Sequence, residues 1–265
     1  MSIAEQYGPW AVVAGASDGV GAALADALAA EGINVVLVAR RQALLEEIAT
    51  RLPVQSRVVA LDLSRPTAIA DLAAATDDLD VGSLFFNAGA DTVNKQLLDR
   101  DLDELRAFVQ RNCTAVVEAS HHFGARMVAR GRGGVVLVTS GAAWAGGSHL
   151  AVYGATKAFD LVLAESLWAE WKPRGVDVLS LVLGPTDTPS FHRSLEAHGA
   201  KGFDGLADPA DVAATALAQL PNGPTWSYGM PDPTGPSPLA ALSRRQAVEL
   251  MSAGHAATFA PPATG

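Results

Sequence analysis

The sequence GGVVLVTSGAAWAGGSHLAVYGATKAF at residues 133–159 joins a predicted strand to a predicted helix. The apolar run at residues 135–138 is typical of a buried strand, and the small residues from Ser140 onward predict a loop. Tyr153 and Lys157 then share one face of the helix, because helix positions four apart are neighbours. We expect the side chains of Ser140, Tyr153 and Lys157 to face one substrate-sized space.

These three side chains suit proton transfer at a carbon–oxygen centre. A tyrosine hydroxyl exchanges protons poorly near neutral pH, and a neighbouring ammonium group favours its phenolate form. Lys157 is placed to supply that charge, and Ser140 to orient a carbonyl oxygen while Tyr153 supplies or removes a proton. The same spacing also recurs by chance on helix surfaces, so the interpretation depends on a cofactor site elsewhere in the chain.

The composition is that of a folded chain and argues against several functions. The 265 residues are 49% hydrophobic, which suffices for one large α/β domain. A net charge of −9 argues against nucleic-acid binding, which needs a basic face. The single cysteine, Cys113, excludes an internal disulfide. No apolar run approaches the roughly 20 residues that span a bilayer, so we expect a soluble cytoplasmic protein with no membrane partner.

Apolar runs and helical stretches alternate along most of the chain. Strands are predicted at residues 10–14, 33–39, 57–61, 135–138 and 176–183. Helical patterns separate them, including a long amphipathic stretch at residues 102–130. This alternation predicts a single domain over residues 1–265, built as a doubly wound, mostly parallel α/β sheet with helices on both faces.

Beyond Pro189 the pattern weakens. We interpret residues 189–207 as a mobile substrate loop beside the site, with an ordinary pair of surface helices as the alternative. A helix is predicted at residues 208–220 and an edge strand at residues 225–228. Residues 229–265 form a C-terminal extension, and its end, residues 256–265, is expected to fray.

The sequence GASDGVG at residues 15–21 lies where the first strand turns into a helix. Glycine at positions 15, 19 and 21 lets the backbone turn tightly and approach a pyrophosphate, and the free N–H groups at the helix start favour its charge. A glycine-rich turn alone is a weak signal, but its strand–turn–helix context strengthens it. The turn therefore predicts a dinucleotide site.

The end of the second strand indicates which dinucleotide binds. An NAD site favours an acidic residue there for the ribose hydroxyl, whereas this chain has Ala39 followed by Arg40. Because arginine suits a 2′-phosphate, NADP is the favoured cofactor, with NAD use left open. The alternative is that Arg40 and Arg41 begin a solvated helix. Asp62, at the end of the third strand, could hold the adenine amino group.

Further short motifs follow along the chain, some at strand ends and others on predicted helices. They are Asp62-Leu63, Asn87-Ala88-Gly89, a lone Asn112, Tyr153-x-x-x-Lys157 and Gly184-x-x-x-Thr188. In this order and spacing, the motifs resemble those of the classical short-chain dehydrogenase/reductase superfamily, and the resemblance covers residues 10 to about 228.

The resemblance implies a Rossmann-like fold and an NADP(H)-dependent oxidoreductase that interconverts a carbonyl and an alcohol. It implies that Tyr153 is the acid-base, that Lys157 binds the nicotinamide ribose and favours the Tyr153 phenolate, that Ser140 holds the substrate oxygen and that Asn112 anchors a proton-relay water. The cofactor-binding residues are expected to be Gly15, Ser17, Gly19, Val20, Gly21, Arg40, Arg41, Asp62, Leu63, Asn87, Ala88, Gly89, Tyr153, Lys157, Gly184 and Thr188.

Three positions depart from the family pattern. Ala14 replaces the usual threonine before the first glycine, and Leu183 replaces the usual proline before Gly184. Asp18 stands where many NADP-using members have a basic residue. Arg40 must then do more of the phosphate recognition, with Ser17 and Arg41 as candidates to assist.

Two other classes of function compete with this one. Residues 15–19 also match the G-x-S-x-G elbow of serine hydrolases, with Ser17 as nucleophile, although too few residues precede it for an oxyanion loop. A non-catalytic NADP-binding sensor on the same fold is the second alternative. The presence of Asn112, Ser140, Tyr153 and Lys157 together argues against it.

Trp144, His149 and Phe191 are candidate substrate-facing residues, with loop packing as an equal alternative for Trp144. Their apolar surroundings suggest a lipophilic ketone or alcohol. No histidine and carboxylate spacing indicates a metal site. The resemblance implies a homodimer or homotetramer, formed through the helices after residue 102 and around Tyr153.

Overall fold

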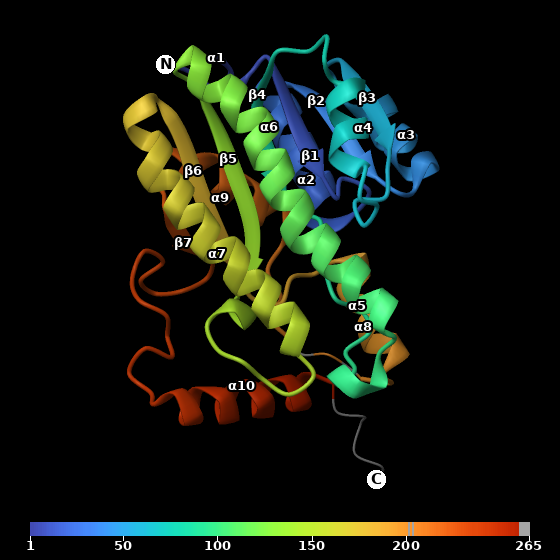
Figure 1. Cartoon of the computed structure of the whole chain (residues 1–265), viewed down its shortest axis with the longest axis vertical. Helices are drawn as coiled ribbons and strands as arrows, with labels where there is room; N and C mark the ends of the chain where they lie inside the picture. The colour runs from blue at the N-terminus through green and yellow to red at the C-terminus, as the bar shows by residue number, and fades with distance from the viewer. Residues whose placement is uncertain (201, 203, 260–265) are drawn as a thin grey trace.

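Seven parallel strands form one sheet in the order β3-β2-β1-β4-β5-β6-β7 (Figure 1). The computed structural model describes residues 1–200, 202 and 204–259. The strands are β1 Trp10–Ala14, β2 Asn34–Ala39, β3 Ser56–Ala60, β4 Val81–Phe86, β5 Gly133–Ser140, β6 Val176–Leu183 and β7 Thr225–Ser227. The predicted fold class, a doubly wound parallel sheet, is confirmed.

Helices cover both faces of the sheet, so the strands are buried on both sides and are almost wholly apolar. In β1, Ala11 and Val13 pack on one face while Val12 and Ala14 pack on the other. Helices α2 Gly19–Ala30, α3 Gln42–Arg51 and α9 Pro209–Gln219 cover the first face. Helices α4 Ala68–Ala75, α6 Ala115–Arg130 and α7 Ala151–Trp171 cover the second. A short helix, α1 Ile3–Tyr7, precedes the sheet.

The predicted long helix at residues 102–130 is three consecutive segments. Helix α5, Leu102–Val109, passes into a π-helical turn, η2 Gln110–Thr114, before α6 begins. The single-turn 3-10 helix η1, Leu97–Asp99, precedes α5. A π turn widens the helix by one residue and is frequent at functional sites. Here it contains Asn112, whose side chain is fully buried.

The C-terminal third differs most from the sequence interpretation. Helix α8, Pro189–Ala197, occupies much of the segment predicted to be a mobile loop, and Thr188 caps it by accepting a hydrogen bond from the Phe191 N–H. Helix α10, Arg244–Thr258, was not predicted and begins with a capping box at Ser243. Residues 256–258, which were expected to fray, form the end of α10, while residues 260–265 lie outside the described part of the chain.

Helix α10 lies across the end of the molecule toward which β5 points (Figure 1). In a parallel α/β sheet this carboxyl end carries the ligand sites, so α10 is placed beside any such site. The remaining short turns are η3 Gly141–Ala143, η4 Lys172–Arg174 and η5 Leu220–Asn222. Within the described residues, no helix has both the length and the apolar character needed to cross a membrane.

Candidate active site

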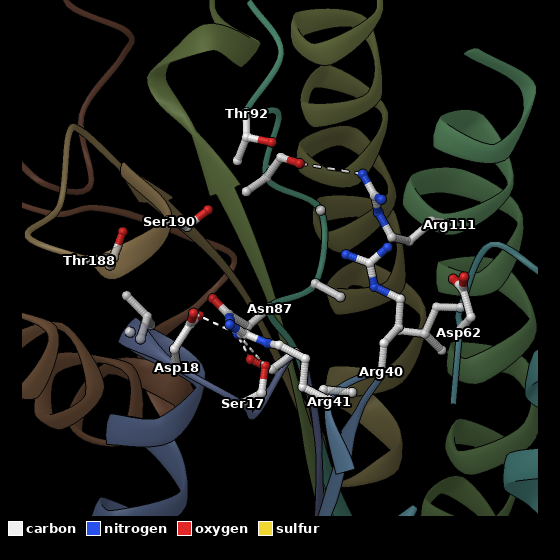
Figure 2. Close-up of a pocket in the computed structure, with 18 of the residues that line it drawn as sticks. Ser17, Asp18, Arg40, Arg41, Asp62, Asn87, Thr92, Arg111, Thr188 and Ser190 are labelled. Atoms are coloured by element: carbon white, nitrogen blue, oxygen red, sulfur yellow. Dashed lines mark hydrogen bonds and ion pairs between the residues drawn. The ribbon is translucent and has the colours of Figure 1, made fainter. Parts of the chain in front are cut away.

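A cavity of about 520 Å³ opens at the carboxyl ends of β1, β2 and β4 (Figure 2). The sheet order reverses between β1 and β4, and such switch points are where open α/β sheets bind ligands. We call this space the cofactor cavity. The predicted residues that line it are Gly15, Ser17, Gly19, Val20, Arg40, Arg41, Asp62, Leu63, Asn87, Ala88, Gly89 and Thr188.

The glycine turn leaves no room for a side chain at Gly21. A Cβ there would lie 2.0 Å from the Gly15 carbonyl oxygen and 2.9 Å from the Asn87 amide nitrogen. Asn87 donates a hydrogen bond to the same Gly15 carbonyl at 3.3 Å, which ties the end of β4 to the turn after β1. Gly21 therefore permits the close contact within the turn, although it does not itself line the cavity.

Two neighbouring arginines at the end of β2 differ in their surroundings. Arg41 donates to the Ser17 hydroxyl at 2.7 Å and to the Asp18 carboxylate at 2.6 Å (Figure 2). Asp18 also accepts from Arg193 of α8 at 3.1 Å. Arg40, in contrast, is exposed and makes no hydrogen bond or ion pair with any residue that the structure describes. Arg40 is thus the cation at this strand end that remains available to an anion.

Arg111 reaches the same cavity and was not predicted to do so. Its guanidinium lies 4.7 Å from the centre of the Phe108 ring, and it interacts electrostatically with Asp62. Burial raises the pKa of Asp62, but hydrogen bonds from Ser64 and the charges of Arg40 and Arg111 outweigh it and hold that pKa below its usual value. The only sequence signal for Arg111 is its position directly before Asn112.

Lys157 is buried beside the cavity. Its ammonium nitrogen donates to the Val138 carbonyl at the end of β5 at 2.9 Å and to the Asp160 carboxylate at 3.1 Å. A Cβ on Gly89, which lines the cavity, would lie 3.0 Å from that nitrogen, and Gly89 also has a φ of +146°. A glycine at position 89 therefore lets the backbone approach the lysine closely.

Asn112 connects the end of β4 to α7. Its Nδ2 donates to the Gly89 carbonyl at 3.0 Å and to the Thr156 hydroxyl at 3.1 Å. Its Oδ1 accepts from Arg111 Nε at 3.0 Å. The side chain is thus held on three sides, and it fixes α7 relative to the cavity.

Ser140 and Tyr153 lie on segments that pack closely together. The Ser140 hydroxyl accepts from the Ala142 N–H at 3.2 Å, and a Cβ on Gly154 would lie 2.9 Å from the Ala142 carbonyl oxygen. The start of α7 therefore rests on the loop that follows Ser140. The Tyr153 ring is half-buried and lies 6.4 Å from the Phe108 ring, edge to face.

The model of the short chain dehydrogenase family matches residues 9–199. The chain belongs to the short-chain dehydrogenase family. A 7β-hydroxysteroid dehydrogenase of Collinsella aerofaciens is 35% identical over 199 residues, which cover 74% of this chain and 75% of that protein.

Two solved structures resemble this short-chain dehydrogenase in fold. One comes from a study of 7β-hydroxysteroid dehydrogenase stereoselectivity and has a TM-score of 0.78 at 32% identity, covering 87% of this chain and 90% of that one. The other is a short-chain dehydrogenase from Sphingobium yanoikuyae in complex with NADPH. It has a TM-score of 0.75 at 26% identity and covers 84% of this chain and 89% of that one.

The candidate substrate residues of the dehydrogenase fall in two places. His149 stacks on His255 of α10, with ring centres 5.7 Å apart, and Phe191 of α8 lies 6.4 Å from Phe259. His198 also contacts Phe259, at 5.3 Å. We call these five residues the aromatic–histidine cluster. Sequence reasoning missed its C-terminal members because α10 was not predicted, although Ser243-x-x-Gln246 is a capping-box signal for its start.

Trp144 lies apart from this cluster. It lines a second cavity of about 300 Å³ between α7 and β7, and its carbonyl accepts from Arg244 at 3.1 Å. On the cofactor side, Thr188 lines the cavity, whereas Gly184 does not. The substrate role of Trp144 and the cofactor role of Gly184 stay predictions.

The serine-hydrolase alternative finds little support in the geometry. In the described part of the chain, the Ser17 hydroxyl has a hydrogen bond only from Arg41, and a cation cannot serve as the general base that a serine nucleophile needs. No group of three or more histidine, cysteine or acidic side chains among these residues could hold a metal ion.

Proposed function

We propose that this short-chain dehydrogenase moves a hydride between NADP(H) and a ketone or secondary alcohol, with Tyr153 as the acid-base. One observation carries the proposal: Lys157 and Asn112 both lie against Gly89, which lines the cofactor cavity. The residues of the predicted catalytic helix and those of the predicted dinucleotide site are therefore neighbours in space.

The residues at the cofactor cavity fit a dinucleotide. The N-terminus of α2 faces the cavity through Gly19, and its free N–H groups suit a pyrophosphate. When bound, the cofactor would donate or accept the hydride. Lys157 would hold the nicotinamide ribose, and Asn87 and Leu63 would line the adenosine.

The protein's own side chains would handle the proton. In the reducing direction Tyr153 donates its hydroxyl proton to the carbonyl oxygen as the carbon gains a hydride, and in the oxidising direction it accepts the alcohol proton. Ser140 would hold the substrate oxygen. The ammonium of Lys157 stabilises the phenolate that forms when Tyr153 gives up its proton, and Asn112 would anchor a relay water.

Preference for NADP follows from the charges at the adenosine end. Among the described residues Arg40 has no hydrogen-bond or ion-pair partner, and Arg111 lines the same cavity, so two guanidinium groups are available to a 2′-phosphate (Figure 2). Asp62 interacts electrostatically with both arginines, and its carboxylate accepts two hydrogen bonds from Ser64. The NADPH complex of the related short-chain dehydrogenase supports this assignment.

We further propose a bulky lipophilic substrate of the hydroxysteroid type. The support is the 7β-hydroxysteroid dehydrogenase relative and the aromatic–histidine cluster beside the predicted site. Assembly as a homodimer or homotetramer is proposed through the partly exposed apolar residues Val117 of α6 and Phe159 and Val162 of α7. A cytoplasmic location stays a prediction from composition.

The test is turnover. Purified protein is mixed with NADPH or NADH and a panel of ketones that includes 7-oxosteroids and 3-oxoacyl thioesters, and the absorbance of the reduced nicotinamide is followed at about 340 nm. The proposal predicts NADPH consumption with a bulky ketone. Tight NADPH binding with no turnover on any panel member would favour the non-catalytic sensor, and absence of nucleotide binding would contradict both.

A further inference from the structure

Asp160 is a buried carboxylate beside Lys157 that none of the predicted roles uses. It lies one turn further along α7, and its Oδ2 accepts from the lysine ammonium at 3.1 Å. The side chains of Lys157 and Asp160 are 5% and 3% exposed. Among the described residues, Oδ1 of Asp160 is buried and has no hydrogen-bond partner.

A carboxylate at this buried position carries a desolvation cost. Asp160 lies on the helix face that also carries Lys157 and the fully buried Ala164, where an apolar residue would pack without desolvating a charge. A buried ion pair is weak evidence for stability, because desolvation offsets most of the attraction between the charges. Asp160 must therefore be explained by what it does to Lys157.

Few other charged or titratable groups face this pair. Cys113 of the π-helical turn is the nearest on the neighbouring segment, and burial, followed by the charge of Asp160, raises the pKa of its thiol to about 11. β5 contributes the Val138 carbonyl, which is neutral. Tyr153 lies on α7 itself, one turn before Lys157. Arg111 of the cavity donates to Asn112 Oδ1 at 3.0 Å, and Asp160 is the counter-charge in direct contact with the ammonium.

We propose that Asp160 is a positioning residue that holds the Lys157 ammonium and offsets part of its charge, and thereby sets the pH range in which Tyr153 exchanges its proton. The inference rests on the proposed function. The ammonium favours the tyrosine phenolate, and a carboxylate 3.1 Å from the ammonium weakens that effect. Removing the charge of Asp160 should therefore make the phenolate easier to form.

The test is the pH profile of alcohol oxidation with NADP in the Asp160→Asn variant, which keeps the shape of the side chain. We expect the midpoint of the rising limb to move to lower pH by about one unit, the size of effect that a neighbouring charge commonly has. Glu170→Gln, which removes an exposed negative charge near the end of α7, is the matched control and should leave the midpoint in place. A merely structural role would lower the melting temperature and the plateau rate without moving the midpoint, and that result would overturn the inference.

A second readout needs neither cofactor nor substrate. Cys113 is the only cysteine, so its reaction with a small thiol reagent can be followed without interference. The rate depends on the thiolate fraction, which the charge of Asp160 suppresses, so Asp160→Asn should react several-fold faster at pH 8.5. An unchanged reaction rate in a folded variant would contradict the assignment of a negative charge to Asp160. Where Asp160→Asn does not fold, Asp160→Thr removes the same charge, keeps a hydroxyl acceptor for the ammonium and carries the same two expectations.

The two proposals fail in different ways. If the wild-type protein turns over no substrate, the proposed function is at fault, and the thiol rates still report on Asp160. If the wild type is active and both the midpoint and the thiol rate are unmoved in Asp160→Asn, only the role of Asp160 is refuted.

Discussion

The cofactor cavity and the aromatic–histidine cluster lie at the same end of the sheet but are built differently. The cavity is formed by strand ends and tight turns. Close backbone contacts, such as the approach of Gly21 to the Gly15 carbonyl, fix the positions of the residues that form it. The cluster is formed by side chains of α8, α10 and the loop before α7, whose rings contact one another.

This difference indicates that the two regions have different functions. A surface made of backbone is rigid and suits a constant ligand, whereas one made of side chains on separate helices changes readily with sequence. We therefore expect substitutions in the first region to act on cofactor and chemistry. Substitutions in the second should act on the substrate.

The largest effect is expected at Tyr153, the proposed acid-base. Tyr153→Phe removes the hydroxyl proton that Tyr153 is proposed to transfer and should lower turnover by about 10³-fold, while NADPH binds within about twofold of wild type. Tyr228→Phe, which removes a hydroxyl just past the end of β7, is the control and should stay near full activity. Near-full activity in Tyr153→Phe would refute the acid-base assignment.

The second-largest effect tests whether the shape of the cavity depends on the backbone of the glycine turn. Gly21→Ala places a Cβ 2.0 Å from the Gly15 carbonyl, so the turn must shift. We expect NADPH affinity to fall by about 100-fold, or roughly 2.7 kcal/mol, together with a lower melting temperature. Gly254→Ala, in α10 with open space around it, should bind NADPH as the wild type does. Equal binding by both variants would contradict a cavity shaped by this turn.

Arg40 provides a more selective change within the cavity. Arg40→Asp should weaken NADPH binding by about 10-fold or more and strengthen NADH binding, because a carboxylate repels the 2′-phosphate and can accept from the ribose hydroxyl. Arg106→Asp reverses an exposed charge on α5 and should change neither constant. Calorimetric titration of both nucleotides measures the difference. Unchanged NADPH affinity in Arg40→Asp would refute its role.

The smallest expected effect concerns the cluster. Burial, followed by the charges of His149 and His198, lowers the pKa of His255, so its neutral form is favoured when α10 is docked. The undocked form binds protons more readily, so docking is favoured above about pH 6.5 and weakens as the pH falls below it. Hydrogen exchange of α10 should accelerate between pH 7.5 and pH 5.5, and less so in His255→Gln. A pH-independent exchange pattern, once corrected for intrinsic rates, would show that His255 has no such effect.

Sequence patterns sufficed for the sheet and for most of the cavity. Gly15, Asn87 and Asp62 were predictable because the end of a parallel strand and its following turn are local features with specific residue requirements. The doubly wound fold followed from the alternation of apolar runs and helices. In both cases the information lies within a few neighbouring residues.

The remaining parts depend on contacts between distant segments. Arg111 belongs to no recognisable motif, and the π turn that contains it and lines the cavity with it was not predicted from the sequence. Asp160 looks like an ordinary polar position until α7 is packed on the sheet, where it is buried. The position of helix α10 depends on contacts with a distant loop. The Ser148 N–H donates a hydrogen bond to the Ser252 hydroxyl, and His149 stacks on His255.

The most direct measurement is a parallel titration of the wild-type protein with NADPH and NADH, followed by quenching of tryptophan fluorescence. The account predicts saturable NADPH binding with a dissociation constant at least about 10-fold lower than that for NADH, because Arg40 and Arg111 line the cavity and are proposed to bind the 2′-phosphate. Failure of both nucleotides to bind at millimolar concentration would contradict the assignment of the cavity as a dinucleotide site.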